Sequence, residues 1–219
     1  LKDFPASDRA PHAHYWLGQL KSGEDPAAAA KHYAAILAQW PESPIAEAAA
    51  YGAAENQFKA GNWDAAITGC DALLKSFPHG EQAPNALYTR GWAAFQSEKW
   101  ELACSSFGEF VKKAPQNPLA EVARAKQAQA LHRLGRLDEA LKLYTELSPL
   151  DNESGLASSI GRATLLFERG DTPAAAEAFE AVAKRLAGDP RRPACLLNAG
   201  HAWFATNNFK RAAAAFEQL

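Results

Sequence analysis

The chain has 219 residues, of which 47% are hydrophobic and 22% charged, and its formal net charge is −2. Because acidic and basic residues are interspersed, we expect no basic face and no nucleic-acid partner. No apolar run reaches the ~18 residues that a membrane-spanning helix requires, so the sequence predicts no transmembrane segment. The 49 alanines favour helix, because alanine has the highest helix propensity.

An apolar residue followed by proline recurs along the first half of the chain. The four prolines are 36, 37 and 37 residues apart. Proline disfavours the α conformation of the residue before it, so each pair predicts the end of a helix. A constant interval of this size indicates one supersecondary unit copied along the chain. The pairs are Phe4-Pro5, Trp40-Pro41, Phe77-Pro78 and Ala114-Pro115.

A turn lies between successive prolines, and an alanine follows it on the next helix. Glycine or asparagine begins most of these turns and can take the left-handed conformation that ends a helix. We expect the alanine where two helices cross closely, and a larger side chain lies one helical turn later on the same face. The alanines are Ala66, Ala103, Ala140, Ala175 and Ala212. The larger side chains are Tyr33, Cys70, Phe107, Tyr144, Phe179 and Phe216.

Upstream of each turn, a second alanine-rich helix carries a small residue at a fixed place. Each repeat is therefore predicted as helix, turn and helix, closed by a proline-bearing loop, and repeats must stack to bury their apolar stripes. We expect residues 1–8 to be the tail of a preceding repeat, and the chain to be part of a longer array. The small residues are Gly18, Ala54, Gly91, Ala128, Ala163 and Gly200. The predicted repeats span about 9–44, 45–81, 82–118, 119–153, 154–190 and 191–219, the last incomplete.

This pattern resembles the tetratricopeptide repeat, and the resemblance covers essentially the whole chain. It is carried by Gly91, Trp100, Ala103, Phe107 and Pro115 in the third repeat. The resemblance implies an all-α, right-handed α–α superhelix that forms a single domain over residues 1–219, and a non-enzymatic scaffold for protein–protein interaction. The chain departs from the family pattern in its period of 35–37 residues and in lacking a tryptophan near the start of the first helix.

Two inter-repeat loops resemble those of a long-period subgroup of the family. They are Trp40-Pro41-Glu42-Ser43-Pro44-Ile45-Ala46 and Ala114-Pro115-Gln116-Asn117-Pro118-Leu119-Ala120. This subgroup is common among bacterial periplasmic and outer-membrane-associated assembly factors. The resemblance therefore favours the periplasm or cell envelope over the cytoplasm, although the compartment stays open.

Nothing in the sequence organises a reaction. The chain has no glycine-rich phosphate loop, no Gly-x-Ser-x-Gly elbow and no His-Glu-x-x-His motif. His12 and His14 would diverge by about 200° on a helix, which argues against a shared metal. Cys70, Cys104 and Cys195 are interpreted as small buried hydrophobes. We therefore expect no catalytic residue, no metal and no cofactor.

In tetratricopeptide arrays the first helix of each pair lines a concave groove, and a few fixed positions on it contact the partner. The resemblance carries these partner-binding positions to residues of all six repeats. In the first three repeats they are Tyr15, Gln19, Tyr51, Glu55, Lys59, Asn85, Tyr88, Trp92 and Gln96. In the last three they are Gln129, His132, Arg133, Thr164, Glu168, Asn198 and His201.

The aromatic residues of the first helices are divided between groove and core. Tyr15, Tyr51 and Tyr88 share one repeat position, and we expect partial exposure because a buried phenol needs a partner for its hydroxyl. Trp92 is either an interface anchor or a cover for the neighbouring repeat. Four phenylalanines that recur later in the helix are expected to serve packing: Phe58, Phe95, Phe167 and Phe204.

The predicted partner is a protein or peptide, laid as an extended segment or a helix on the aromatic groove. The groove positions mix basic residues and asparagine with glutamate and alanine, so a carboxylate clamp is not favoured. Two alternatives stay open: a small molecule or lipid in a pocket closed by the superhelix, or the scaffold part of a larger enzyme. Self-association through exposed repeat ends is also consistent with the sequence.

Overall fold

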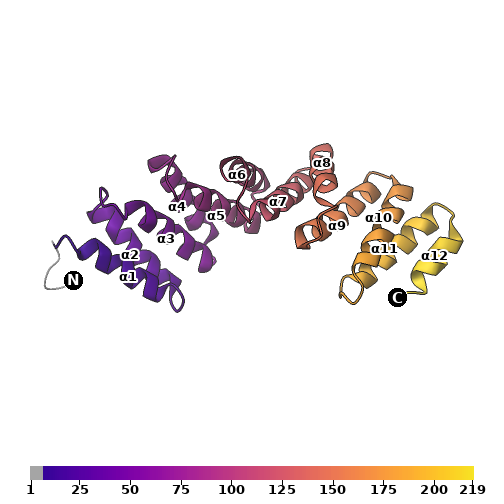
Figure 1. The fold of residues 1–219 in the computed structure, drawn as a ribbon, viewed down its shortest axis with the longest axis horizontal. Helices are drawn as coiled ribbons and strands as arrows, with labels where there is room; N and C mark the ends of the chain where they lie inside the picture. Colours follow the sequence, from indigo (N-terminus) through magenta and orange to yellow (C-terminus); the bar gives the residue numbers. More distant parts are fainter. Residues whose placement is uncertain (1–6) are drawn as a thin grey trace. The chain divides into compact units, whose positions relative to one another are not determined.

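The computed structural model describes residues 7–219, and over these residues the fold is all-α, with twelve helices and no strand (Figure 1). The first six are α1 (Ala10–Lys21), α2 (Pro26–Gln39), α3 (Ala46–Lys59), α4 (Trp63–Ser76), α5 (Ala83–Gln96) and α6 (Trp100–Lys113). The last six are α7 (Ala120–Arg133), α8 (Leu137–Leu147), α9 (Glu153–Glu168), α10 (Thr172–Arg185), α11 (Arg192–Ala205) and α12 (Phe209–Phe216). The predicted all-α class is confirmed.

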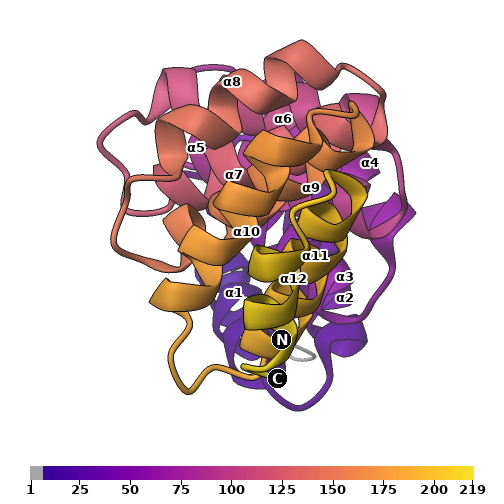
Figure 2. The same cartoon turned by 90° about the vertical axis from the view of Figure 1, so that its right-hand side faces the viewer.

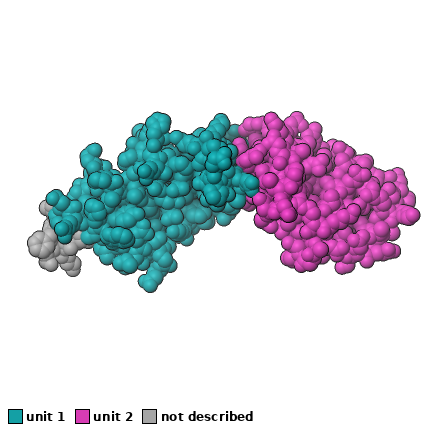
Figure 3. Space-filling view, viewed as in Figure 1, with its two compact units in different colours: residues 1–123 teal, residues 124–219 magenta. Residues whose placement is uncertain are grey.

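The chain divides into two compact units, unit 1 over residues 1–123 and unit 2 over residues 124–219 (Figure 3). Within each unit, helices that follow one another in sequence pack together, as α9 to α12 do in unit 2 (Figure 2). Packing between sequence neighbours is the arrangement of repeat proteins. The assignment of residues 1–219 to one array of six repeats stays a prediction.

The helices before the prolines end where the sequence predicts. Trp40, Phe77 and Ala114 have φ between −138° and −129° and ψ between 59° and 61°, outside the α region. Steric conflict with the following proline ring accounts for this conformation. The remaining pair, Phe4-Pro5, lies outside the described residues.

The turns inside the repeats use the left-handed backbone conformation. Gly61, Gly135 and Gly170 have φ between 74° and 80°, and Asn207 has φ 59°. The third repeat has Glu98 at this place, with φ 57°. Glycine takes this conformation without steric cost, whereas a side chain with a Cβ is strained in it. Glu98 therefore occupies a turn position whose left-handed backbone conformation is unfavourable for glutamate.

The core of each repeat is built where a small residue of the first helix meets a large residue of the second. A Cβ on Gly91 would lie 2.8 Å from Cε1 of Phe107, and a Cβ on Gly18 would lie 2.7 Å from Cζ of Tyr33. Only a residue without a side chain fits against these rings. The alanines predicted at helix crossings are all at most 2% exposed: Ala66, Ala103, Ala140, Ala175 and Ala212.

The packing role predicted for the four recurring phenylalanines is wrong for two of them. Phe58 and Phe95 are half-buried, each with its ring centroid 5.1 Å from that of the tryptophan that begins the next helix. Phe167 is 44% exposed because Thr172 stands where those tryptophans lie. Phe204 is 60% exposed although its ring lies 5.2 Å from that of Phe209.

The three cysteines are buried, as the sequence predicts. They contribute to the packing between helices, and Cys70 belongs to a core cluster with Ala54 and Leu73. Burial raises the pKa of the Cys70 thiol to about 12 and also raises the pKa of Cys195. A thiol that stays protonated is a poor nucleophile, so Cys70 and Cys195 act as small apolar side chains.

Candidate functional site

The three tyrosines that share a repeat position in unit 1 are half-buried, which confirms their predicted partial exposure. The Tyr15 hydroxyl accepts a hydrogen bond from Nε2 of Gln19 at 3.0 Å. The Tyr51 hydroxyl lies 3.3 Å from Oγ1 of Thr89, on the first helix of the next repeat. Burial raises the pKa of Tyr51 to about 12, so its hydroxyl stays protonated at neutral pH. The hydroxyl groups of Tyr15 and Tyr51 thus bond to nearby side chains.

The charged positions of α3 are partly neutralised within the helix. Nζ of Lys59 lies 3.0 Å from Oε2 of Glu55, at i and i+4 on one face. Nζ of Lys59 also lies 3.5 Å from Oγ of Ser22, in the turn of the first repeat. These contacts bring Glu55 and Lys59 together, as the predicted groove requires, but leave no isolated cation for a carboxylate clamp.

On α5, Trp92 packs against the second helix of its own repeat. Its ring centroid lies 6.0 Å from that of Phe107 and 6.3 Å from that of Tyr88. The side chain is half-buried, so one part of the ring covers the core and another meets solvent. Of the other predicted positions on α5, Asn85 donates to Oε1 of Gln82 at 2.9 Å, and Gln96 is exposed.

In unit 2, a hydrogen bond links the first helices of the fourth and fifth repeats. Nε2 of His132 lies 2.7 Å from Oε2 of Glu168, and the imidazole ring lies 6.1 Å from the ring of Tyr144. Gln129 accepts a hydrogen bond from Lys126 at 3.0 Å, and Arg133 is exposed. The contact brings together one predicted position of α7, His132, and one of α9, Glu168.

The most concentrated group of predicted residues lines a single pocket of about 310 Å³ between α9 and α11. All four groove residues predicted for the fifth and sixth repeats contribute to it: Thr164, Glu168, Asn198 and His201. The buried ring of Phe179 and the exposed ring of Phe167 complete the lining. Phe167 is the residue that the sequence assigned to packing, and its exposure could have been inferred from the absence of a tryptophan at Thr172.

The described residues contain no group of three or more His, Cys, Asp or Glu side chains arranged to hold a metal ion. His14 and His32 form the closest histidine contact, with Nδ1 atoms 3.2 Å apart, and no carboxylate or thiol completes a ligand set there. Over the same residues, no helix combines the length and apolar character needed to cross a bilayer.

The alternating helix pairs, left-handed turns and small-to-aromatic contacts define a helical repeat protein. Sequence models of the tetratricopeptide repeat match residues 11–90, 88–154 and 160–219. The chain belongs to the tetratricopeptide repeat family. This fold supports a general role as a protein–protein interaction scaffold, and repeats of this kind are typically non-catalytic. Comparison with curated proteins finds no match.

Solved structures share the fold at low sequence identity. A tetratricopeptide repeat protein from Parabacteroides merdae superposes with a TM-score of 0.71 and 16% identity, covering 96% of this chain and 78% of that one. MamA (41-end) from Desulfovibrio magneticus RS-1 superposes with a TM-score of 0.69 and 17% identity, covering 84% of this chain and 98% of that one. BtubC from P. vanneervenii superposes with a TM-score of 0.64 and 14% identity, covering 96% of this chain and 90% of that one. These similarities concern the fold.

Proposed function

We propose that this chain binds a peptide segment of a protein partner along the exposed faces of its first helices, and that the α9–α11 pocket receives one apolar side chain of that segment. The observation that carries the proposal is the convergence of Thr164, Asn198 and His201 around the rings of Phe167 and Phe179. Polar groups around an aromatic floor suit a peptide, whose side chain packs on the rings while its backbone bonds to the rim.

The charge of this pocket supports a neutral contact rather than a carboxylate clamp. No lysine or arginine lines the pocket, and its one carboxylate, Glu168, is hydrogen-bonded to His132. A peptide terminus would bring a full charge without a matching partner at the rim, which is unfavourable for binding. An internal peptide segment fits better than a free carboxyl end.

The exposure of the rim also distinguishes a peptide from a small molecule or lipid. Glu168, Asn198 and His201 are exposed, so the pocket opens along the helix faces. Small-molecule sites enclose most of the ligand surface, whereas a peptide needs an open path on both sides of a pocket. A role in cell-envelope assembly stays a prediction that rests on the two loop sequences alone.

A peptide library displayed on phage and selected on the immobilised protein would test the proposal. We expect selected internal segments to share one large apolar residue. Phe167→Ala should weaken a selected peptide about tenfold, because aromatic contacts concentrate binding energy. Asn198→Ala should weaken it less. Fluorescence anisotropy with a labelled peptide measures both.

Lys184→Ala provides the matched control, because Lys184 is an exposed residue of α10 outside the pocket lining. The control should bind the selected peptide within a factor of two of the wild type. Equal affinity for wild type, Phe167→Ala and Asn198→Ala would reject the α9–α11 pocket as the peptide site.

A further inference from the structure

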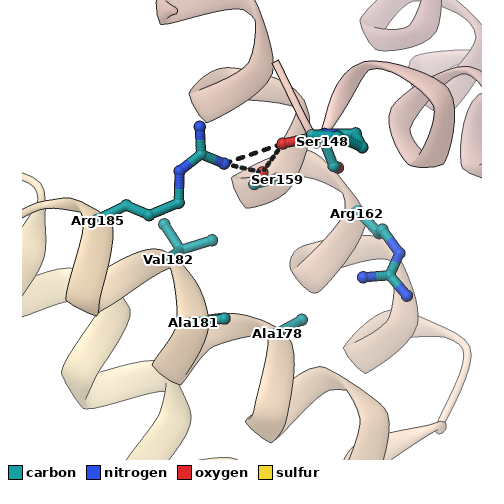
Figure 4. A pocket seen from close by; sticks show the side chains of 8 residues that line it. Ser148, Ser159, Arg162, Ala178, Ala181, Val182 and Arg185 are labelled. Carbon is teal, nitrogen blue, oxygen red and sulfur yellow. Dashed lines mark hydrogen bonds between the residues drawn. The ribbon is translucent and has the colours of Figure 1, made fainter. Parts of the chain in front are cut away.

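A second pocket of unit 2, of about 280 Å³, lies between α9, α10 and the end of α8 (Figure 4). Arg162 of α9 and Arg185 of α10 line it, and its apolar part comes from Ala178, Ala181 and Val182. Arg162 and Thr164 are two positions apart on α9, so their side chains leave the helix about 200° apart. This crevice is therefore separate from the α9–α11 pocket.

Arg185 is held by the neighbouring loop. Its Nη1 donates to the carbonyl oxygen of Ser148 at 2.9 Å and to Oγ of Ser159 at 3.0 Å (Figure 4). Its Nη2 donates to the carbonyl oxygen of Leu150 at 2.7 Å. These acceptors are neutral, so the guanidinium is positioned without a compensating negative charge.

Arg162 differs in that its Nε is buried and has no hydrogen-bond acceptor among residues 7–219. In Figure 4 no dashed line joins Arg162 to the other residues drawn around the pocket. A buried donor without a partner is costly. The Arg162 side chain as a whole is half-buried, so this cost concerns its Nε–H group, which no acceptor in unit 2 satisfies.

The third repeat shows how the same position is satisfied internally. Arg90 directly precedes the small residue Gly91, as Arg162 directly precedes Ala163. The Arg90 guanidinium donates to Oγ of Ser106 at 2.9 Å, to Oδ1 of Asp71 at 2.8 Å and to Oε2 of Glu109 at 3.4 Å.

Each of the Arg90 partners is replaced in the fifth repeat. Ser106 directly precedes Phe107, and the residue that directly precedes Phe179 is Ala178. Glu109 lies two residues after Phe107, and Ala181 lies two residues after Phe179. Asp71 follows Cys70, whereas the residue after Tyr144 is Thr145. The arginine is present in both repeats, but its counter-charges are present only in the third.

We propose that the Arg162 crevice receives the carboxylate of an aspartate or glutamate side chain from a protein partner. A planar carboxylate pairs with one guanidinium through two parallel hydrogen bonds, and Arg162 lines the crevice without a carboxylate of the described residues bonded to it. The alanines and Val182 beneath it offer apolar contact to the methylene groups of an acidic side chain, which inorganic phosphate lacks. This proposal rests on the proposed function, since it adds an acidic contact on the opposite face of α9.

The Nε–H resonance of Arg162 in ¹H–¹⁵N spectra of the whole chain reports directly on this contact, and Arg162→Lys assigns it. The probe is a capped peptide of four Glu-Ala repeats, with four Gln-Ala repeats as the neutral equivalent. We expect the glutamate peptide to shift the resonance saturably and the glutamine peptide to leave it in place. No shift with either peptide would refute the proposal.

Sodium phosphate at matched ionic strength separates an acidic side chain from a free oxyanion. A shift by phosphate at concentrations lower than those of the glutamate peptide would contradict the assignment to a protein side chain. We expect phosphate to be the weaker ligand, because it gains nothing from the apolar wall.

Two charge-matched variants complete the test. Arg162→Gln should weaken the glutamate peptide about tenfold, the loss expected for one charge-assisted pair. Arg169→Gln removes the same charge from an exposed pair with Asp138 and should change the affinity less than twofold. Equal losses in both variants would indicate a general charge effect and overturn the site. Asn198→Ala should leave this titration unchanged, so failure of the α9–α11 pocket and failure of the Arg162 crevice are distinguishable.

Discussion

The crevice between consecutive repeats is lined mostly by apolar residues in unit 1, whereas in unit 2 its lining includes two arginines. In unit 1, a pocket of about 520 Å³ beside α4 is lined by Ala53 and Ser76, among mostly apolar neighbours. In unit 2, the crevice beside α10 has Arg162 and Arg185 at the same repeat positions. Ala53 and Arg162 each precede the small residue of the first helix, and Ser76 and Arg185 each lie six residues after the large residue of the second.

This difference distinguishes the positions that form the packing contacts of each repeat from the neighbouring positions that line its crevices. The small-to-large contact of first and second helix recurs in both units, as Gly91 with Phe107 and Ala163 with Phe179. The residue next to the contact changes from alanine to arginine without changing the helix pair. The residues proposed for the Arg162 crevice therefore lie at positions adjacent to the contacts that recur in each repeat.

The largest effects are expected where the two units are alike. Ala103→Leu in unit 1 and Ala175→Leu in unit 2 should each lower the free energy of unfolding by about 1–3 kcal/mol, because both alanines are fully buried at helix crossings. Urea denaturation followed by circular dichroism measures the change. A leucine variant that unfolds like the wild type would show that its alanine does not lie at a helix crossing. The repeat positions assigned to the two units would then not correspond.

A smaller effect should distinguish the two arginines that share a repeat position. Arg90→Leu should cost about 1–2 kcal/mol, because the buried hydroxyl of Ser106 loses its partner and two carboxylates lose their cation. Arg162→Leu should be neutral or stabilising, since it removes a buried Nε–H group that has no acceptor. Parallel urea titrations compare them. Equal destabilisation would mean that Arg162 has a structural role like that of Arg90.

The turns of the two units allow a further comparison. Glu98 in unit 1 and Gly170 in unit 2 both have positive φ, at 57° and 80°. Glu98→Gly should stabilise the chain by about 1 kcal/mol by removing the strain of a Cβ in this conformation. Gly170→Ala should destabilise it by a similar amount. Thermal denaturation would test both, and a destabilising Glu98→Gly would show that the glutamate side chain contributes more than its backbone strain costs.

The smallest effect concerns pH and unit 1. Burial, then repulsion from His32, lowers the pKa of His14 below its usual value. The unfolded chain then binds the proton more readily, so stability should fall as pH drops from about 7 to about 5. Amide exchange in α1 should accelerate over this range relative to α10, whose residues include no histidine. His14→Gln should remove the acceleration, and an unchanged pH response would exclude His14 as its source.

The sequence was sufficient to predict the elements and their main contacts, because each depends on local chemistry. Proline places the helix ends at Phe77 and Ala114, and glycine places the turns at Gly61 and Gly135. The pairing of Gly91 with Phe107 follows from their phase in adjacent helices. The resemblance to the tetratricopeptide repeat, and not local chemistry, supplied Thr164, Glu168, Asn198 and His201, which line one pocket.

The remaining features depend on which side chains cover one another across repeats. Phe167 resembles Phe95 in sequence position, but it is exposed because Thr172 cannot cover it as Trp100 covers Phe95. Arg162 was missed because resemblance to the family directs attention to the groove. Its signal was the loss, in the fifth repeat, of the acidic partners that Arg90 has in the third.

The burial of the three thiols has a consequence for chemical labelling and oxidative damage. The sequence contains no methionine, and Cys70, Cys104 and Cys195 are all buried. Peroxide and alkylating reagents therefore find little accessible sulfur on the native chain, since reaction requires an exposed thiolate or thioether. A single cysteine introduced on the surface would be the preferred site of attachment for a spin label or fluorophore, with the native cysteines left in place.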